Sequence, residues 1–155
     1  PFFNYMYGDL SMTYELMQHP QTRNGLSDAG AHCGAICDGG MPTFMLTHWA
    51  RDRVRGPKLS LEHVVYRQTR NTAELHGLCD RGVIAPGMKA DINVIDFDAL
   101  GFDMPTMAYD LPASGRRLVQ TAHGYVATFV SGVQTVADDA FTGELPGKLI
   151  RGPRR

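Results

Sequence analysis

Asp28 is the residue whose position best suits acid–base chemistry. It follows an apolar stretch and opens a run of small residues in the segment Gly-Leu-Ser-Asp-Ala-Gly-Ala-His, residues 25–32. At the C-terminal end of a strand in a β/α barrel, a carboxylate faces the active site, where it can take a proton from metal-bound water and pass it to a leaving amine. An aspartate before small residues also caps helices and fixes turns, and the local pattern by itself favours that structural role.

A second group of residues could bind a metal. His32, Cys33, Cys37 and Asp38 are all of types found in zinc sites. The group has no Cys-x-x-Cys pair and no second half at a matching spacing, so small buried thiols in a tight loop are the favoured interpretation.

A third cluster, made of His48, Trp49, Arg51 and Arg53, falls on a predicted helix. An arginine can hold a substrate carboxylate through two parallel hydrogen bonds. Charged side chains are exposed in most proteins, so we interpret the cluster as a solvated helix face that carries one buried tryptophan.

Helices around one short strand are predicted for the first half of the chain. The strand covers Thr22–Ser27, directly before Asp28. Proline in the first turn of a helix loses no hydrogen bond, so Met41-Pro42 marks a helix start, and Ser60 is suited to cap the next helix. The other helix signals are a helical pattern at 10–18 that stops at His19-Pro20, a capping box of Asn71 with Glu74, and a C-terminal stop at Gly77.

The second half of the chain is predicted to consist mostly of short strands. Pro86-Gly87 has the composition of a type II turn, and Ser131-Gly132 has that of a hairpin turn. The segment 98–117 contains prolines and is predicted to be an irregular connection. The predicted strands are 90–97, 118–122, 125–130 and 133–136.

Composition and charge narrow the class of protein. The chain has 155 residues, of which 43% are hydrophobic and 20% charged, with a net charge of −1. No basic stripe indicates nucleic acid, and no polybasic run or long apolar stretch indicates a membrane. The odd number of cysteines fits no disulfide framework and predicts reduced thiols in a cytoplasmic protein. Because the sequence opens with Pro1 instead of Met, we expect that the true N-terminus is missing.

Two stretches taken together resemble a known family. One is residues 25–32, and the other is the run Asn-Thr-Ala-Glu-Leu-His-Gly at 71–77 followed by Asp-Arg-Gly-Val-Ile-Ala-Pro-Gly-Met-Lys-Ala-Asp-Ile-Asn-Val-Ile-Asp at 80–96. The second stretch resembles the amidohydrolase superfamily, where such a helix end precedes a Pro-Gly turn and a strand that ends in Asp. The first stretch narrows the resemblance to the branch of N-acyl-D-amino-acid deacylases. The resemblance as a whole extends over roughly residues 10–147.

The resemblance implies an α/β fold in two parts. Residues 1–78 would hold the last strand and helices of a β/α (TIM-like) barrel. Residues 79–155 would supply the C-terminal strands of a small β-sandwich that both ends of the whole protein build. The chain would then be the C-terminal fragment of a longer enzyme.

The resemblance also implies roles for two residues. Asp28 would be the catalytic aspartate at the end of the last barrel strand, and in some relatives this residue also contacts the metal. His32 would lie near the substrate. The family's other zinc-site residues, a His-x-His pair, a bridging Cys or Lys and further histidines, have no matching positions here. A catalytic zinc keeps about three protein ligands, so we expect the fragment alone to be inactive.

Several functions follow as hypotheses. The leading one is zinc-dependent hydrolysis of the N-acyl amide bond of N-acyl-D-amino acids, a small-molecule reaction without a nucleic-acid or membrane partner. A near alternative is a cyclic-amide hydrolase of the dihydropyrimidinase or dihydroorotase type. A zinc module built on His32, Cys33 and Cys37 is the least favoured.

A hypothesis of another class is a non-catalytic fragment that acts by association. A barrel reduced to one strand would leave Phe44, Trp49, Val64 and Val65 uncovered, and large exposed apolar patches bind partners or aggregate. This hypothesis predicts oligomers or dependence on the missing N-terminal part.

Overall fold

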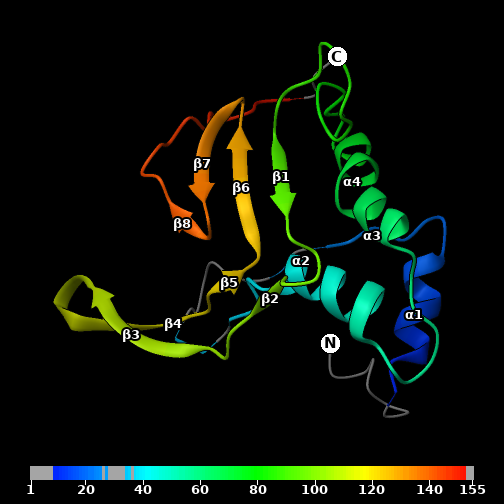
Figure 1. Cartoon of the computed structure of the whole chain (residues 1–155), viewed down its shortest axis with the longest axis horizontal. Coiled ribbons are helices and arrows are strands. Elements are labelled where there is room, and N and C mark those ends of the chain that lie inside the picture. The colour runs from blue at the N-terminus through cyan, green and yellow to red at the C-terminus, as the bar shows by residue number, and fades with distance from the viewer. Residues whose placement is uncertain (1–8, 26, 28–33, 36, 153–155) are drawn as a thin grey trace.

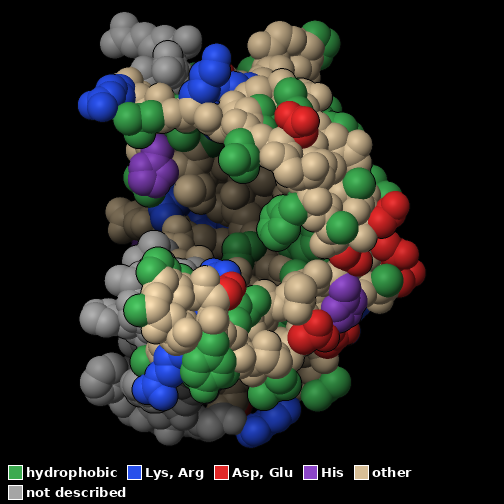
Figure 2. Space-filling view, turned by 90° about the vertical axis from the view of Figure 1, so that its left-hand side faces the viewer, with side chains coloured by type: hydrophobic (Ala, Val, Ile, Leu, Met, Phe, Trp, Pro, Cys, Tyr) green, Lys and Arg blue, Asp and Glu red, His purple; other side chains and the backbone are tan. Residues whose placement is uncertain are grey.

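The computed structural model describes residues 9–25, 27, 34–35 and 37–152. The first half of the chain forms helices and the second half forms strands, which confirms a mixed α/β chain (Figure 1). The helices gather on one side, and the largest sheet stands beside them with β1 (Ile92–Ile95) as the edge strand nearest the helices. Seen from the left-hand side of Figure 1, away from the helices, the surface is hollowed between that sheet above and a projecting hairpin below (Figure 2).

The helices begin and end largely where the sequence predicts. Helix α1 ends at His19, whose ψ of 132° is extended, as expected for a residue before proline. The predicted cap of α3 is confirmed, because the hydroxyl of Ser60 accepts a hydrogen bond from the backbone N–H of His63 at 3.2 Å. The helices are α1 (Ser11–Gln18), α2 (Met41–Phe44), which continues as the π-helix η2 (Met45–Asp52), α3 (Leu61–Gln68) and α4 (Arg70–Leu75).

The predicted capping box of α4 is wrong. Asn71 lies inside the helix, and Thr69 is the residue that precedes it. The Asn71 side chain is buried, accepts a hydrogen bond from Arg67 at 3.2 Å and donates one to the Tyr66 hydroxyl at 3.2 Å. The Asn71 side chain therefore bonds to side chains of α3 and does not cap α4, although its type and its spacing from Glu74 suggest a cap.

The predicted stop at Gly77 is confirmed. Its φ of 66° lies in the left-handed region, which glycine adopts without steric cost. The N–H of Leu78 donates to the carbonyl of Ala73 at 2.8 Å, and the N–H of Gly77 donates to that of Glu74 at 3.1 Å. These two bonds are the Schellman arrangement, which satisfies the last carbonyls of the helix.

All strand pairs are antiparallel. The four-stranded sheet has the order β1-β6-β7-β8, and two further pairs, β2-β5 and β3-β4, stand apart from it. The remaining bounds are β2 (Gly101–Phe102), β3 (Thr106–Leu111), β4 (Gly115–Val119), β5 (Ala122–His123), β6 (Tyr125–Val130), β7 (Val133–Ala137) and β8 (Ala140–Phe141). Residues 142–152 follow without helix or strand.

Both predicted turns are confirmed. Met88 N–H donates to the Ala85 carbonyl at 3.1 Å, and Gly87 has φ 85°, as a type II turn with glycine at its third position requires. Between β6 and β7, Ser131 and Gly132 have φ of 52° and 82°. Positive φ at both central residues matches a type I′ hairpin turn.

The prediction of an irregular segment at 98–117 is wrong. The β3-β4 hairpin occupies most of it, and a 3-10 turn, η3 (Pro112–Ser114), joins the two strands. Arg117 and Asp110 face each other across the hairpin through two hydrogen bonds of 2.7 and 2.6 Å. Pro112 lies in the turn, so it does not remove a ladder donor.

The core lies between the helices and the near edge of the sheet, and it covers part of the face that the hypothesis of a fragment acting by association leaves open. Trp49 is 2% exposed and Val64 0%, so these two residues are buried and that prediction is wrong for them. Phe44 is half-buried and packs against the core, whereas Val65 stays 43% exposed. The buried cluster is Met45, Leu46, Trp49, Leu59, Val64 and Leu100.

The strand predicted at Thr22–Ser27 is not formed in the part of the segment that the structure describes. Residues 22–25 and 27 have irregular backbone. A parallel barrel strand needs hydrogen-bonded neighbours on both sides, and no described segment pairs with these residues. Among the described residues, no helix is both long and apolar enough to cross a membrane.

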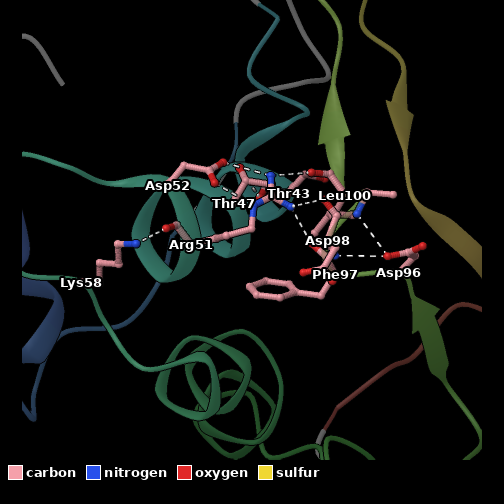
Figure 3. A network of polar contacts seen from close by, with 10 residues as sticks. Thr43, Thr47, Arg51, Asp52, Lys58, Asp96, Phe97, Asp98 and Leu100 are labelled. Carbon is pink, nitrogen blue, oxygen red and sulfur yellow. Dashed lines mark hydrogen bonds and ion pairs between the residues drawn. The ribbon is translucent and has the colours of Figure 1, made fainter.

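Arg51 connects the helical region to the strand region. From η2 its guanidinium reaches the loop after β1, where it donates to the carbonyls of Phe97, Asp98 and Leu100 (Figure 3). It also forms an ion pair with Asp52, with Nε 2.7 Å from Oδ1. These contacts exclude the free guanidinium that carboxylate binding would need.

Candidate functional site

A cavity of about 440 Å³ lies between α1, residues 22–25 and 27, α2 with η2, and the ends of α3 and α4. Ser27 lines it, and the next residue in the sequence is Asp28. The predicted site residues Asp28 and His32 themselves lie outside the described residues. The described part of the candidate site is therefore the cavity lined by Ser27.

One wall of the cavity is polar. The Oγ1 atom of Thr13, the Nε atom of Arg23 and the Nδ2 atom of Asn24 are buried, and none has a hydrogen-bond partner among the described residues. The remaining contacts of Arg23 are local, since its Nη1 donates to the carbonyls of Pro20 at 2.6 Å and Thr22 at 2.8 Å. A buried polar group without a partner costs about 1–3 kcal/mol.

Much of the remaining lining is apolar and belongs to the core. Met45 and Trp49 of η2 line it, together with Leu10 and Met17 at the two ends of α1. Trp49 also stacks on Tyr14 with ring centroids 6.5 Å apart. The indole is therefore fixed in position at the edge of the cavity.

The charge near the polar wall is positive. Arg67 is 4% exposed and donates to the carbonyls of Met17 at 2.9 Å and His19 at 3.4 Å. Burial lowers the pKa of the Arg67 guanidinium, and the positive charge of Arg23 lowers it further. The described residues that line the cavity include no carboxylate to balance Arg23.

The predicted cluster around His48 is more buried than expected. Arg53 is 3% exposed, stacks on Trp49 at 4.5 Å and donates to the Asp9 carbonyl at 3.1 Å. The prediction of a solvated face is wrong for this arginine, whereas that of a buried Trp49 is confirmed. The His48 ring stacks on Phe44 with centroids 4.8 Å apart.

His48 lies in an environment that disfavours its charged form. Burial lowers its pKa below the ordinary value of 6.5, and the charge of Arg53 lowers it further, while Asp52 acts in the opposite direction. Its Nε2 atom is buried without a partner in the described part of the chain. The ring borders a second hollow of about 290 Å³ beside Arg51 and Phe102.

The predicted metal group is not assembled by the residues that the structure covers. Cys37 is half-buried and Asp38 is exposed, while His32 and Cys33 lie outside the described residues. Across residues 9–25, 27, 34–35 and 37–152, no three His, Cys, Asp or Glu side chains come together as metal ligands would.

Sequence reasoning missed Thr13, Arg23 and Asn24. The signal for two of them is the pair Arg23-Asn24 inside a segment predicted to be a buried strand, where an arginine and an amide need partners. Thr13 carries no such signal, because its role depends on how α1 packs.

The chain is similar to known proteins. A sequence model described as "Amidohydrolase family" matches residues 9–136. A D-aminoacylase from Alcaligenes xylosoxydans xylosoxydans is 31% identical over 110 residues, which are 68% of this chain and 19% of that protein. A crystal structure of a D-aminoacylase, described as defining a novel subset of amidohydrolases, is 31% identical, covers 66% of this chain and 19% of its own, and has a TM-score of 0.48. The chain thus spans about a fifth of the length of these relatives.

Proposed function

This chain belongs to the amidohydrolase family, and we propose that it is the C-terminal part of a zinc-dependent hydrolase of N-acyl-D-amino acids. In this proposal, residues 1–78 complete a β/α barrel, and residues 79–155 supply strands of a β-sandwich. The match to D-aminoacylase over 110 residues supports the branch of the family.

The observation that supports the proposal for the site is the cavity lined by Ser27, the residue before Asp28 in the sequence. The lining of this cavity includes both polar and apolar side chains. An N-acyl amino acid has the same division, since it carries an amide, a carboxylate and an apolar side chain. Asp28 would act as general base toward the attacking water and then as general acid toward the departing nitrogen. His32 would contact the substrate.

Zinc does not fit the described residues, because no three ligand-type side chains gather there. In the complete enzyme, ligands outside this chain would hold the metal, and Asp28 is the single ligand that this chain could add. A catalytic zinc keeps about three protein ligands, so the chain alone is inactive in this proposal.

A chimeric enzyme tests the substrate class. In the Alcaligenes D-aminoacylase, the 110-residue segment that matches this chain is replaced by the matching residues of this chain, so that the relative supplies the remainder of the enzyme. The proposal predicts release of acetate from N-acetyl-D-leucine, loss of that activity with a chelator and recovery with zinc.

Dihydrouracil serves as the competing substrate. Hydrolysis of dihydrouracil but not of N-acetyl-D-leucine would contradict the proposal and favour the cyclic-amide alternative. A folded, zinc-loaded chimera that hydrolyses neither compound would also contradict it. The parent D-aminoacylase, assayed in parallel, controls for the assay and the metal.

A further inference from the structure

Strands of the second half of the chain lie against the glycine-rich segment that follows Asp28 in the sequence. The described residues of this glycine segment run from Gly34 to Gly40, without residue 36. A Cβ placed on Gly34 would lie 3.8 Å from the carbonyl oxygen of Arg116 in β4, which is ordinary van der Waals contact. A Cβ placed on Gly40 would lie only 2.6 Å from Oε1 of Gln120, the residue after β4. The glycine segment therefore lies next to β4 at both of its described ends.

The Gln120 side chain is itself held in place by the strands. Its Nε2 donates to the carbonyl of Asp103 at 2.9 Å, and the N–H of Asp103 donates to the carbonyl of Thr121 at 2.9 Å. The Gln120 amide therefore continues the pairing of β2 with β5, and it cannot turn away from Gly40 without losing a hydrogen bond. Phe102, the last residue of β2, fills the adjacent space, with Cδ2 3.6 Å from the Cβ position of Gly40.

Gly40 connects the segment that carries Asp28 to helix α2, whose first two residues line the cavity. Helix α2 has a separate contact with the strand region, because the hydroxyls of Thr43 and Tyr125 are hydrogen-bonded at 2.7 Å. Loss of the Gln120 side chain would leave this bond intact. The contact of Gln120 with Gly40 therefore acts mainly on the residues before α2.

We infer that Gln120 is a positioning residue for hydrolysis, because it holds Gly40 and with it the C-terminal end of the segment that carries Asp28. The role of Asp28 rests on the proposed function. A general acid–base group must lie within hydrogen-bond reach of the reacting atoms, and a displacement of about 1 Å can lower a rate about a hundredfold. Gln120 acts in this inference through the glycine segment and contacts neither substrate nor metal.

Hydrogen exchange on the full chain tests the contact without catalysis. In Gln120→Ala, the amides of the glycine segment should exchange about fivefold faster, the factor expected for the loss of one hydrogen bond. Exchange in α2 should not change, because its bond to β6 remains. Gln134→Ala is the matched control, since the Gln134 amide also donates to a carbonyl, that of Val136 at 3.1 Å, but lies on β7 in the other sheet.

Kinetics separate a positioning role from a purely structural one. The enzyme for this test is a zinc-loaded chimera that joins the part of the Alcaligenes D-aminoacylase preceding the match to the whole of this chain. Gln120→Ala should lower kcat for N-acetyl-D-leucine about tenfold to a hundredfold and leave KM unchanged. Gln134→Ala should change neither constant. Each kcat is normalised to the concentration of folded, zinc-loaded enzyme, so that a loss of stability does not count as a loss of positioning.

A double variant tests whether Gln120 acts through Gly40. Gly40 has φ −73° and ψ −4°, which alanine adopts freely, so Gly40→Ala should lower kcat only through the clash with Gln120. Because the two residues are in contact, the double variant should lose no more activity than Gln120→Ala alone. Gly147→Ala is the control, since a Cβ there meets no described atom within 4 Å.

Unchanged exchange of the glycine segment in Gln120→Ala would overturn the inference. Equal kcat values for Gln120→Ala and the unsubstituted chimera would also overturn it, as would an effect confined to KM or additive losses in the double variant. The proposed function fails by a different result, absence of hydrolysis of N-acetyl-D-leucine by the unsubstituted chimera. The exchange experiment does not depend on that activity, so the two failures are distinguishable.

Discussion

At the scale of single residues, buried arginines form contacts that connect separate segments of the chain. Arg53 is buried against Trp49 and a backbone carbonyl, and Arg67 is buried against two carbonyls and Asn71. The sequence predicts a solvated face for Arg53, because charged residues are exposed in most proteins. A guanidinium can be buried when backbone carbonyls accept its hydrogens, and such carbonyls leave no trace in the sequence.

His48 gives a prediction for the pH dependence of stability. Its pKa in the folded chain is depressed, so the unfolded chain takes up a proton at higher pH than the folded chain does. The stability that His48 contributes is therefore fully present above pH 6.5, its ordinary value, and is lost as the pH falls below it. In urea titrations between about pH 7 and about pH 5, His48→Gln should show a smaller loss of unfolding free energy than the unsubstituted chain.

The exposed His76 at the end of α4 provides the matched control for that experiment. His76→Gln removes one histidine without touching the stack on Phe44. If His48→Gln leaves the pH dependence of the unfolding free energy unchanged, the buried environment of His48 does not influence stability.

At the scale of elements, local chemistry is predictable and tertiary pairing is not. Gly77, Gly87 and the Ser131-Gly132 turn adopt the positive φ that their predicted roles require. The β3-β4 hairpin was unexpected because prolines suggest an irregular segment, yet Pro105 precedes β3 and Pro112 lies in the turn. The segment 22–27 has a strand-like pattern, but its described residues, 22–25 and 27, pair with no other described segment. No pattern within the segment can reveal this.

Two glycines with nearly the same φ allow the cost of backbone strain to be measured separately from the cost of a steric clash. Gly124 has φ 92°, and a Cβ there would lie 2.6 Å from the Cα of the buried Leu100. Gly143 has φ 91°, but a Cβ there meets nothing within 4 Å. We expect Gly143→Ala to cost about 1 kcal/mol, for the left-handed backbone alone. Gly124→Ala should cost at least about 2 kcal/mol more, because the backbone of Leu100 must move.

The measurement for this pair is the midpoint and slope of urea unfolding. Similar losses of unfolding free energy in the two variants would mean that Gly124 does not lie close against Leu100. The connection between β5 and β6 would then not pack against the core.

At the scale of the whole molecule, Arg51 joins the two regions that the family resemblance assigns to barrel and sandwich. Its bonds to the loop after β1 run from the helical part to the strand part (Figure 3). The sequence was sufficient to predict the family and Asp28 as its catalytic candidate. It could not predict the cavity, because Thr13, Arg23 and Trp49 come from separate segments and meet only in the folded chain.

The central claim, that this chain supplies the catalytic aspartate of an N-acyl-D-amino-acid hydrolase, is tested most directly by Asp28→Asn in the zinc-loaded chimera. Asp38→Asn, an exposed aspartate further along the same part of the chain, is the control. The measured quantity is kcat/KM for N-acetyl-D-leucine. Loss of the general acid and base predicts a fall of at least about 100-fold in Asp28→Asn and little change in Asp38→Asn. Equal kcat/KM values in the chimera and its Asp28→Asn variant would contradict the claim.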